Sequence, residues 1–248
     1  VIDEMWNVVA AKVFEKDMYY SQDATDIRAL PKLEGTVHVN IALVLKFMPA
    51  YLGAAYGAGQ EYDAIPVRQD AAEDEYLFNQ RPAKGLGRIK FPDWRPSFER
   101  FSHLPNVAAF REQIDAFTQL VMSAPPSEAQ QKNLDYLQVL GQLFTQVVYA
   151  QLICESAGLA LDGTAEDKRE GSVSDISDLT EAHIDRIFAV FVQDFSEFAV
   201  NLHGQPSASE AQQEGALKLI KHPTVTDEAE EAFVAEVLSY DGTYVMPE

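Results

Sequence analysis

Apolar residues recur three and four positions apart through most of this chain, and this spacing constrains the fold more than any other feature. Spacings of three and four place side chains on one face of an α-helix, whereas a half-buried strand needs strict alternation. No alternation persists and no internal repeat is visible, so the sequence predicts an all-α fold, a helical bundle. The clearest run contains Ile184, Phe188, Phe191, Phe195 and Phe198.

The first 57 residues predict two helices separated by a break. We expect one helix over residues 2–20 and a second helix from Thr36 to about Tyr56. Between them, the helical pattern breaks from Ser21 to Leu33, where Pro31 marks the stop. Lys46 is the only charged residue between Val37 and Tyr56. His38, Asn40, Lys46 and Pro49 interrupt this apolar run, so a helix buried in a bundle is favoured over a membrane span. Pro49 should kink the helix or end it early.

The remaining residues predict a connection and then a second helical part. Residues 58–105 are expected to form an irregular strap, acidic in its first half and basic in its second. The basic half could hold a phosphate, or it could pack against an acidic neighbouring surface. Residues 106–248 are expected to form a helical extension, interrupted by an exposed polar loop over 162–178. Capping boxes are predicted at Ser127–Gln130 and Ser207–Glu210, and a last helix over roughly 226–239. Two further stripes, meaning apolar residues at helical spacing that should share one helix face, are predicted in this part. They are Val107, Phe110, Ile114, Phe117 and Val121, and then Leu134, Leu137, Leu140, Phe144, Val147 and Leu152.

Composition narrows the class of partner. The chain has 248 residues and a formal net charge of −20, which argues against a surface for nucleic acid or anionic membranes. The single cysteine, Cys154, excludes an internal disulfide and favours a reducing compartment, so we expect a cytoplasmic protein. Cys154 itself is expected to be a small core residue.

The sequence contains none of the motifs sought for a metal site or an activated nucleophile. A di-iron bundle needs Glu-x-x-His pairs, and none is present. The five histidines lack paired metal-ligand spacing, so no metal site is predicted. Neither a Gly-x-Ser-x-Gly elbow nor a glycine-rich phosphate loop occurs.

The segment Leu33-Glu34-Gly35-Thr36 is the strongest candidate for chemistry. It places a carboxylate at the end of a loop, followed by glycine and the start of a helix. Helix N-termini present unpaired N–H groups, and glycine lets a ligand approach the backbone, so Glu34 is well placed for a general base. The alternative is that Glu34 is only a first-turn acid stabilised by the helix dipole.

The stretch Tyr20-Ser-Gln-Asp-Ala-Thr-Asp-Ile-Arg-Ala-Leu-Pro-Lys-Leu-Glu34-Gly-Thr36 resembles the C-terminal part of acyl-CoA dehydrogenases, which carries the Glu-Gly-Thr motif. Looser similarity to an extended helical C-terminal region lies in Phe101-Ser-His-Leu-Pro-Asn-Val-Ala, Leu202-His-Gly-Gln-Pro206 and Tyr240-Asp-Gly-Thr-Tyr-Val-Met-Pro247. The resemblance implies that residues 1–57 end a dehydrogenase bundle and that 106–248 form an additional helical domain. It further implies that most of the FAD-binding part precedes Val1, so that this portion alone would be inactive.

The resemblance also assigns roles. Glu34 would be the catalytic base that removes the α-proton of an acyl-CoA thioester, and its N–H would bind the thioester carbonyl. Gly35 would line the substrate channel, while Thr36 and His38 would lie at the FAD, which takes hydride from the β-carbon. His38 stands where the family commonly has Gln or Glu, and Ile41 where it usually has Arg.

The partners implied by the family are the acyl-CoA substrate of fatty acid metabolism, an electron-accepting flavoprotein or its equivalent, and further copies of the chain in a homo-oligomer. The competing hypothesis is a non-catalytic helical interaction or oligomerisation domain in which Glu34 is structural.

Overall fold

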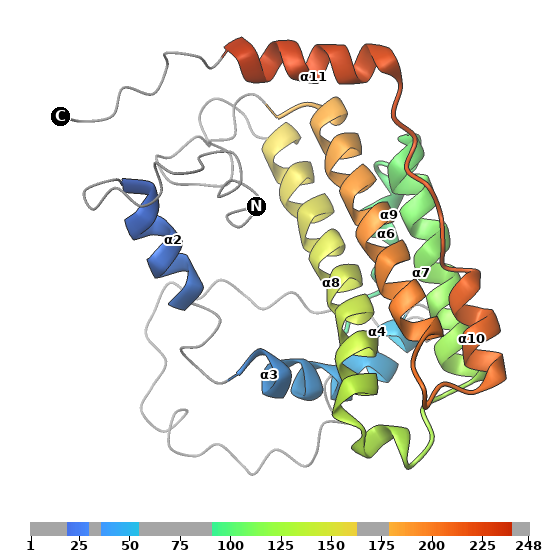
Figure 1. Cartoon of the computed structure of the whole chain (residues 1–248). Coiled ribbons are helices and arrows are strands. Elements are labelled where there is room, and N and C mark those ends of the chain that lie inside the picture. Colours follow the sequence, from blue (N-terminus) through green and yellow to red (C-terminus); the bar gives the residue numbers. More distant parts are fainter. Residues whose placement is uncertain (1–18, 30–35, 55–90, 163–178, 240–248) are drawn as a thin grey trace, which may run out of the picture.

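The computed structural model describes residues 19–29, 36–54, 91–162 and 179–239, and these contain helices and no strand. The prediction of an all-α fold is confirmed (Figure 1). The α-helices are α2 (Tyr19–Ala29), α3 (Val37–Val44), α4 (Met48–Ala54), α6 (Arg95–Glu99), α7 (Pro105–Ser123), α8 (Leu134–Asp162), α9 (Glu181–His203), α10 (Glu210–Leu217) and α11 (Asp227–Ser239), with 3-10 turns η3 (Leu45–Phe47) and η5 (Gln130–Lys132).

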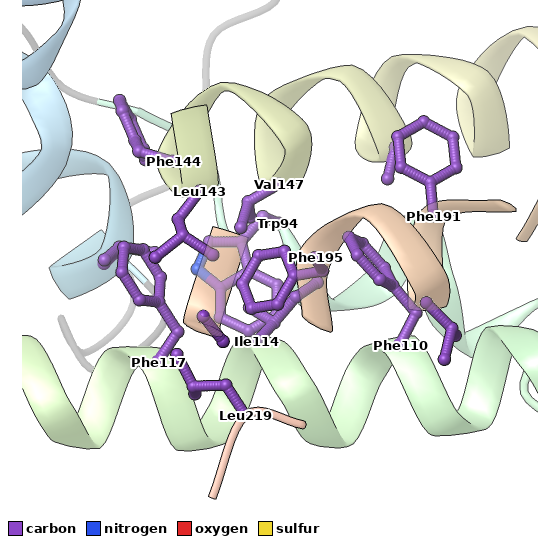
Figure 2. Packing of buried hydrophobic residues seen from close by; sticks show 14 of the residues in the cluster. Trp94, Phe110, Ile114, Phe117, Leu143, Phe144, Val147, Phe191, Phe195 and Leu219 are labelled. Atoms are coloured by element: carbon purple, nitrogen blue, oxygen red, sulfur yellow. The ribbon is translucent and has the colours of Figure 1, made fainter. Parts of the chain in front are cut away.

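The core lies between the three long helices. α9 packs against both α7 and α8, and the short α10 covers the end of α7 and α9 (Figure 1). Figure 2 shows their aromatic side chains meeting in the centre. The Phe195 ring packs edge-on against Phe110 and Phe117, with centroids 5.4 Å and 5.8 Å away. The predicted stripes of α7 and α9 are confirmed, since their members are buried except for the half-buried Val121 and Phe198.

The predicted stripe of α8 is partly wrong. Leu140, Phe144 and Val147 are buried, but Leu134 is 64% exposed and Leu152 is 54% exposed. Leu152 follows Val147 by five residues, which turns it well away from the buried face. The stretch Leu134–Asp162 is also long and apolar enough to cross a membrane, and half of its most apolar window is buried in the bundle. Core helices of bundles have the same composition.

One of the two predicted capping boxes is shifted. Ser127 and Gln130 do exchange hydrogen bonds, but they open the η5 turn, and α8 begins only after Asn133. The box before α10 is formed by Ser209 and Gln212, not by Ser207 and Glu210. Ser207 is already engaged, because its carbonyl accepts from Gln130 at 2.6 Å.

The predicted break after residue 20 is wrong for most of its length. α2 continues through Ser21 to Ala29, and Thr25 Oγ1 donates to the Ser21 carbonyl at 2.8 Å. No glycine or proline occurs between Tyr19 and Ala29, and Pro31 follows two residues after the helix ends, as Pro disfavours helix in the residue before it. Residues 2–18 of the predicted first helix lie outside the described residues.

The second predicted helix exists as three consecutive pieces, α3, η3 and α4. Pro49 is the second residue of α4, where its missing N–H is not needed, so the interruption at η3 precedes it. The prediction of a fully buried helix is wrong for its first half, because α3 buries no residue, whereas Leu45, Met48, Tyr51 and Leu52 are buried. The apolar face of α3 extends beyond the bundle that covers α4.

The last part of the predicted strap packs into the core. Residues 91–104 include α6, and Trp94, Phe98 and Phe101 are fully buried, so the irregular interpretation is wrong for Arg95–Glu99, while the residues on either side of α6 form no regular helix. Arg95 pairs with Asp93 at 2.6 Å, and Arg100 pairs with Asp162. Only Arg100 bears on the interpretation that the basic half packs against an acidic neighbouring surface, because Asp162 belongs to α8 whereas Asp93 lies in the strap itself. Residues 55–90 and the predicted polar loop beyond Asp162 lie outside the described residues, and the division into 1–57, 58–105 and 106–248 stays a prediction.

Candidate functional site

The helix after the Glu-Gly-Thr motif begins where the sequence predicts. Thr36 is the N-cap of α3, and its Oγ1 accepts a hydrogen bond from the backbone N–H of Val39 at 3.4 Å. The Thr36 carbonyl accepts from the N–H of Asn40 at 3.1 Å. An N-cap oxygen satisfies one first-turn donor, and the first N–H groups of a helix have no partner within it. The motif therefore comes immediately before a helix N-terminus.

Two of the four predicted site residues are described. Thr36 is the N-cap of α3 and His38 is its second residue, and both side chains are exposed. Both groups can donate and accept hydrogen bonds. Glu34, the predicted base, and Gly35, the predicted substrate contact, lie outside the described residues, and their roles stay predictions.

Ile41, at the position where the resembled family usually has arginine, has a packing role. A Cβ placed on Gly141 of α8 would overlap the Ile41 side chain, so α3 approaches α8 closely only because residue 141 is glycine. This contact fixes α3 on the bundle while Val39, 62% exposed, and Leu43, 49% exposed, remain uncovered by the described residues.

An apolar groove lies at the other end of this segment, between α4 and the turn from α7 into α8. Its volume is about 800 Å³. Apolar side chains dominate its walls, while Lys46 and Lys132 are its charged lining residues within the described part of the chain. Sequence reasoning missed this groove, although Lys46 as the one charge in an apolar run was a signal. The other walls come from residues 121–140, which the sequence pattern does not bring together with Lys46.

His183 and His103 have structural partners. His183 Nδ1 accepts from the Thr180 N–H at 3.2 Å, completing a capping box for α9, and its Nε2 lies 2.8 Å from Glu236. His103 Nε2 lies 3.0 Å from Glu181. Among the described residues, no group of three or more His, Cys, Asp or Glu side chains is arranged to hold a metal ion.

A chain of hydrogen bonds that runs from the core to the exposed Glu155 connects α4, α6 and α8. The Tyr51 hydroxyl donates to Gln151, Gln151 Nε2 donates to Glu155 at 2.7 Å, and Ser97 donates to the same carboxylate at 2.8 Å. Burial raises the pKa of the Tyr51 phenol. Burial, reinforced by the charge of Glu155, also raises the pKa of the adjacent Cys154 thiol to about 12. Cys154 is thus a protonated core residue, as predicted, and not an activated nucleophile.

A smaller cavity of about 390 Å³ separates α11 from the start of α9. Its charged lining side chains are engaged by other residues: Arg186 binds Glu230 at 2.6 Å, His183 binds Glu236, and Asp185 accepts hydrogen bonds from Asn106. The Arg186 guanidinium also lies over the Phe233 ring, 4.5 Å from its centroid. These contacts link α11 to α9.

No family model, no curated protein and no solved structure matches this chain.

Proposed function

We propose that this chain is the C-terminal portion of an FAD-dependent acyl-CoA dehydrogenase. The observation that supports it is the N-cap at Thr36, which puts the Glu-Gly-Thr motif directly before a helix N-terminus. A loop carboxylate beside unpaired helix N–H groups suits proton abstraction next to a carbonyl, because the same site can stabilise the developing enolate.

The residues of this chain would act on the α-carbon of the thioester. The Glu34 carboxylate takes the α-proton, and the C–H electron pair left behind forms the new double bond as hydride leaves the β-carbon. The Glu34 backbone N–H donates to the thioester carbonyl oxygen, which carries negative charge as the proton leaves. Gly35 leaves room for the acyl chain beside the backbone.

Two described residues fit the cofactor. Thr36 and His38 expose polar side chains at the start of α3, and the exposed apolar Val39 lies one residue beyond His38. The ring system of FAD is flat with polar edges, so its binding site needs both polar and apolar side chains. Bound FAD would supply the two-electron acceptor for the departing hydride. On this proposal the protein is cytoplasmic, forms a homo-oligomer and passes its electrons to another flavoprotein or an equivalent acceptor.

Replacing Glu34 by glutamine in the complete protein tests the proposal. Glu34→Gln keeps the size of the side chain but removes the base, so turnover of a saturated acyl-CoA with an artificial electron acceptor should fall by about 10²–10⁴-fold. Flavin absorbance should be unchanged. Asp26→Asn, an exposed acid on α2, is the matched control and should keep full activity.

Full turnover in Glu34→Gln would contradict the dehydrogenase proposal. The alternative is then a helical interaction or oligomerisation domain. Uncovered apolar side chains on the long helices favour that alternative, because contiguous exposed apolar surface marks association sites. Leu159 is 68% exposed, Tyr149 is 59% exposed and Val190 is 56% exposed. An oligomer in the absence of flavin and of any activity, measured by light scattering, would support this second function.

A further inference from the structure

The apolar groove is built by segments that are distant in sequence. Leu45, Met48 and Leu52 form one wall, from η3 and α4, and all three are buried. Met122 at the end of α7 and Leu134 at the start of α8 form the facing edge, where they are 66% and 64% exposed. Its volume of about 800 Å³ lies within the range of small-molecule sites, which are concave and mostly apolar.

The charge at the groove is opposite to that of the protein. The chain carries 39 acidic and 19 basic residues, yet the charged residues lining the groove, within the described part, are Lys46 and Lys132. Lys132 already pairs with Glu128 at 2.9 Å. No described carboxylate forms an ion pair with Lys46, so within the described part of the chain this exposed lysine is an unpaired positive charge that lines an apolar groove.

We propose that this groove binds a free single-chain amphiphile, a long alkyl carboxylate, with its chain along the apolar walls and its head at Lys46. A monoanion matches one uncompensated lysine, and an unbranched chain matches a groove with few polar wall groups. This binding site goes beyond the proposed dehydrogenation. Its walls begin at Ala42, beyond the Glu-Gly-Thr motif and Thr36, and it requires neither a thioester nor a flavin.

Chain length provides the first test. The full chain is titrated by calorimetry with octanoate, decanoate, dodecanoate and tetradecanoate below their micellar concentrations. Each methylene that leaves water should tighten binding about fourfold, until the groove is full and the affinity reaches a plateau. One molecule should bind per chain. Dodecyltrimethylammonium, with the same tail and the opposite charge, should bind more weakly.

Variants at the groove provide the second test. Met122→Asp places a charge on the apolar edge and should weaken dodecanoate binding by about tenfold or more. Lys46→Glu should weaken it about fivefold and strengthen binding of the ammonium amphiphile. Leu159→Asp is the matched control, because Leu159 lies on α8 with 68% exposure but does not line the groove. Its affinity should be that of the unsubstituted chain. All three sites are exposed, so circular dichroism should show folded proteins.

Several results would overturn the proposal: no saturable binding, affinity independent of chain length, or the same loss in Leu159→Asp as in Met122→Asp. Equal affinity for both head groups would reject the role of Lys46. Binding to anionic phospholipid vesicles that Met122→Asp leaves unchanged would indicate a membrane surface instead. Glu34→Gln should leave dodecanoate binding intact, so failure of this site and failure of the dehydrogenase proposal are separable.

Discussion

At the scale of single residues, Asp194 is a carboxylate whose surroundings oppose its charge. It lies half-buried on α9, where Gln146 Nε2 of α8 is 3.4 Å from its Oδ2. Burial raises the pKa of Asp194 above its usual range, and the nearby Glu197 adds to the effect, while the Gln146 hydrogen bond counteracts it. The folded state therefore holds this proton to a higher pH than the unfolded state does.

The consequence is a pH-dependent loss of stability. Between the unfolded and the raised folded pKa the native state binds more protons, so stability falls as pH rises through that window. Asp194→Asn removes the ionisation and should raise Tm at neutral pH, with a gain that grows as pH rises from the unfolded pKa of about 4 through the raised folded pKa and is constant above it. Thermal scans at several pH values measure this. Glu214→Gln, an exposed acid on α10, is the control, and an equal gain in both variants would contradict the argument.

At the scale of elements, the sequence predicts those helices best whose stripe meets a single core. α9 has one buried face, and the predicted run contains its buried Ile184 and its three buried phenylalanines, although it misses Val192 and Leu202. α8 contacts α9 on one side and α3 on another, so its apolar residues spread around the helix and the stripe is ambiguous. The start of α10 was misplaced because Ser207 and Ser209 both precede a Glu or Gln by three residues, and only tertiary contacts to the η5 turn distinguish them.

The candidate site was also predictable only in part from the sequence. A capping threonine is a local signal, so the start of α3 at Thr36 followed from the sequence. The groove was not predictable, because its walls join residues near Lys46 to residues near Leu134, and no local pattern encodes that contact.

α11 is an element held by polar contacts. It has no buried residue, and its contacts to α9 include the Arg186–Glu230 and His183–Glu236 pairs and the stacking of Arg186 over Phe233. Exposed ion pairs are weak and screened by salt, so we expect α11 to detach easily. Arg186→Ala should increase hydrogen exchange throughout α11 while α9 stays protected, and high salt should have the same effect on the unsubstituted chain.

The matched control for α11 is Lys132→Ala, which removes an exposed ion pair that does not involve α11 or α9. Unchanged exchange of α11 in Arg186→Ala would mean that apolar contacts hold this helix instead.

At the scale of the whole molecule, one aromatic cluster joins four helices that span more than a hundred residues of sequence. Phe98 of α6 meets Phe110 of α7 and Phe188 of α9, with centroids 6.4 Å and 6.3 Å away. α8 adds Leu143, Phe144 and Val147 to the same core (Figure 2). The described bundle is thus expected to unfold as a cooperative unit, because none of these helices can bury its apolar face alone.

Phe195 tests this cooperativity because it lies at the centre of the cluster with no exposed surface. Phe195→Ala removes its edge contacts to Phe110 and Phe117 and leaves a cavity, so the free energy of unfolding should fall by about 3–5 kcal/mol. Val200→Ala, on the same helix but 53% exposed, should change it by less than about 0.5 kcal/mol. In urea, fluorescence and circular dichroism should report one shared midpoint that moves for Phe195→Ala. Separate midpoints for the two probes would show that α7, α8 and α9 do not fold together, since a single core admits only one transition.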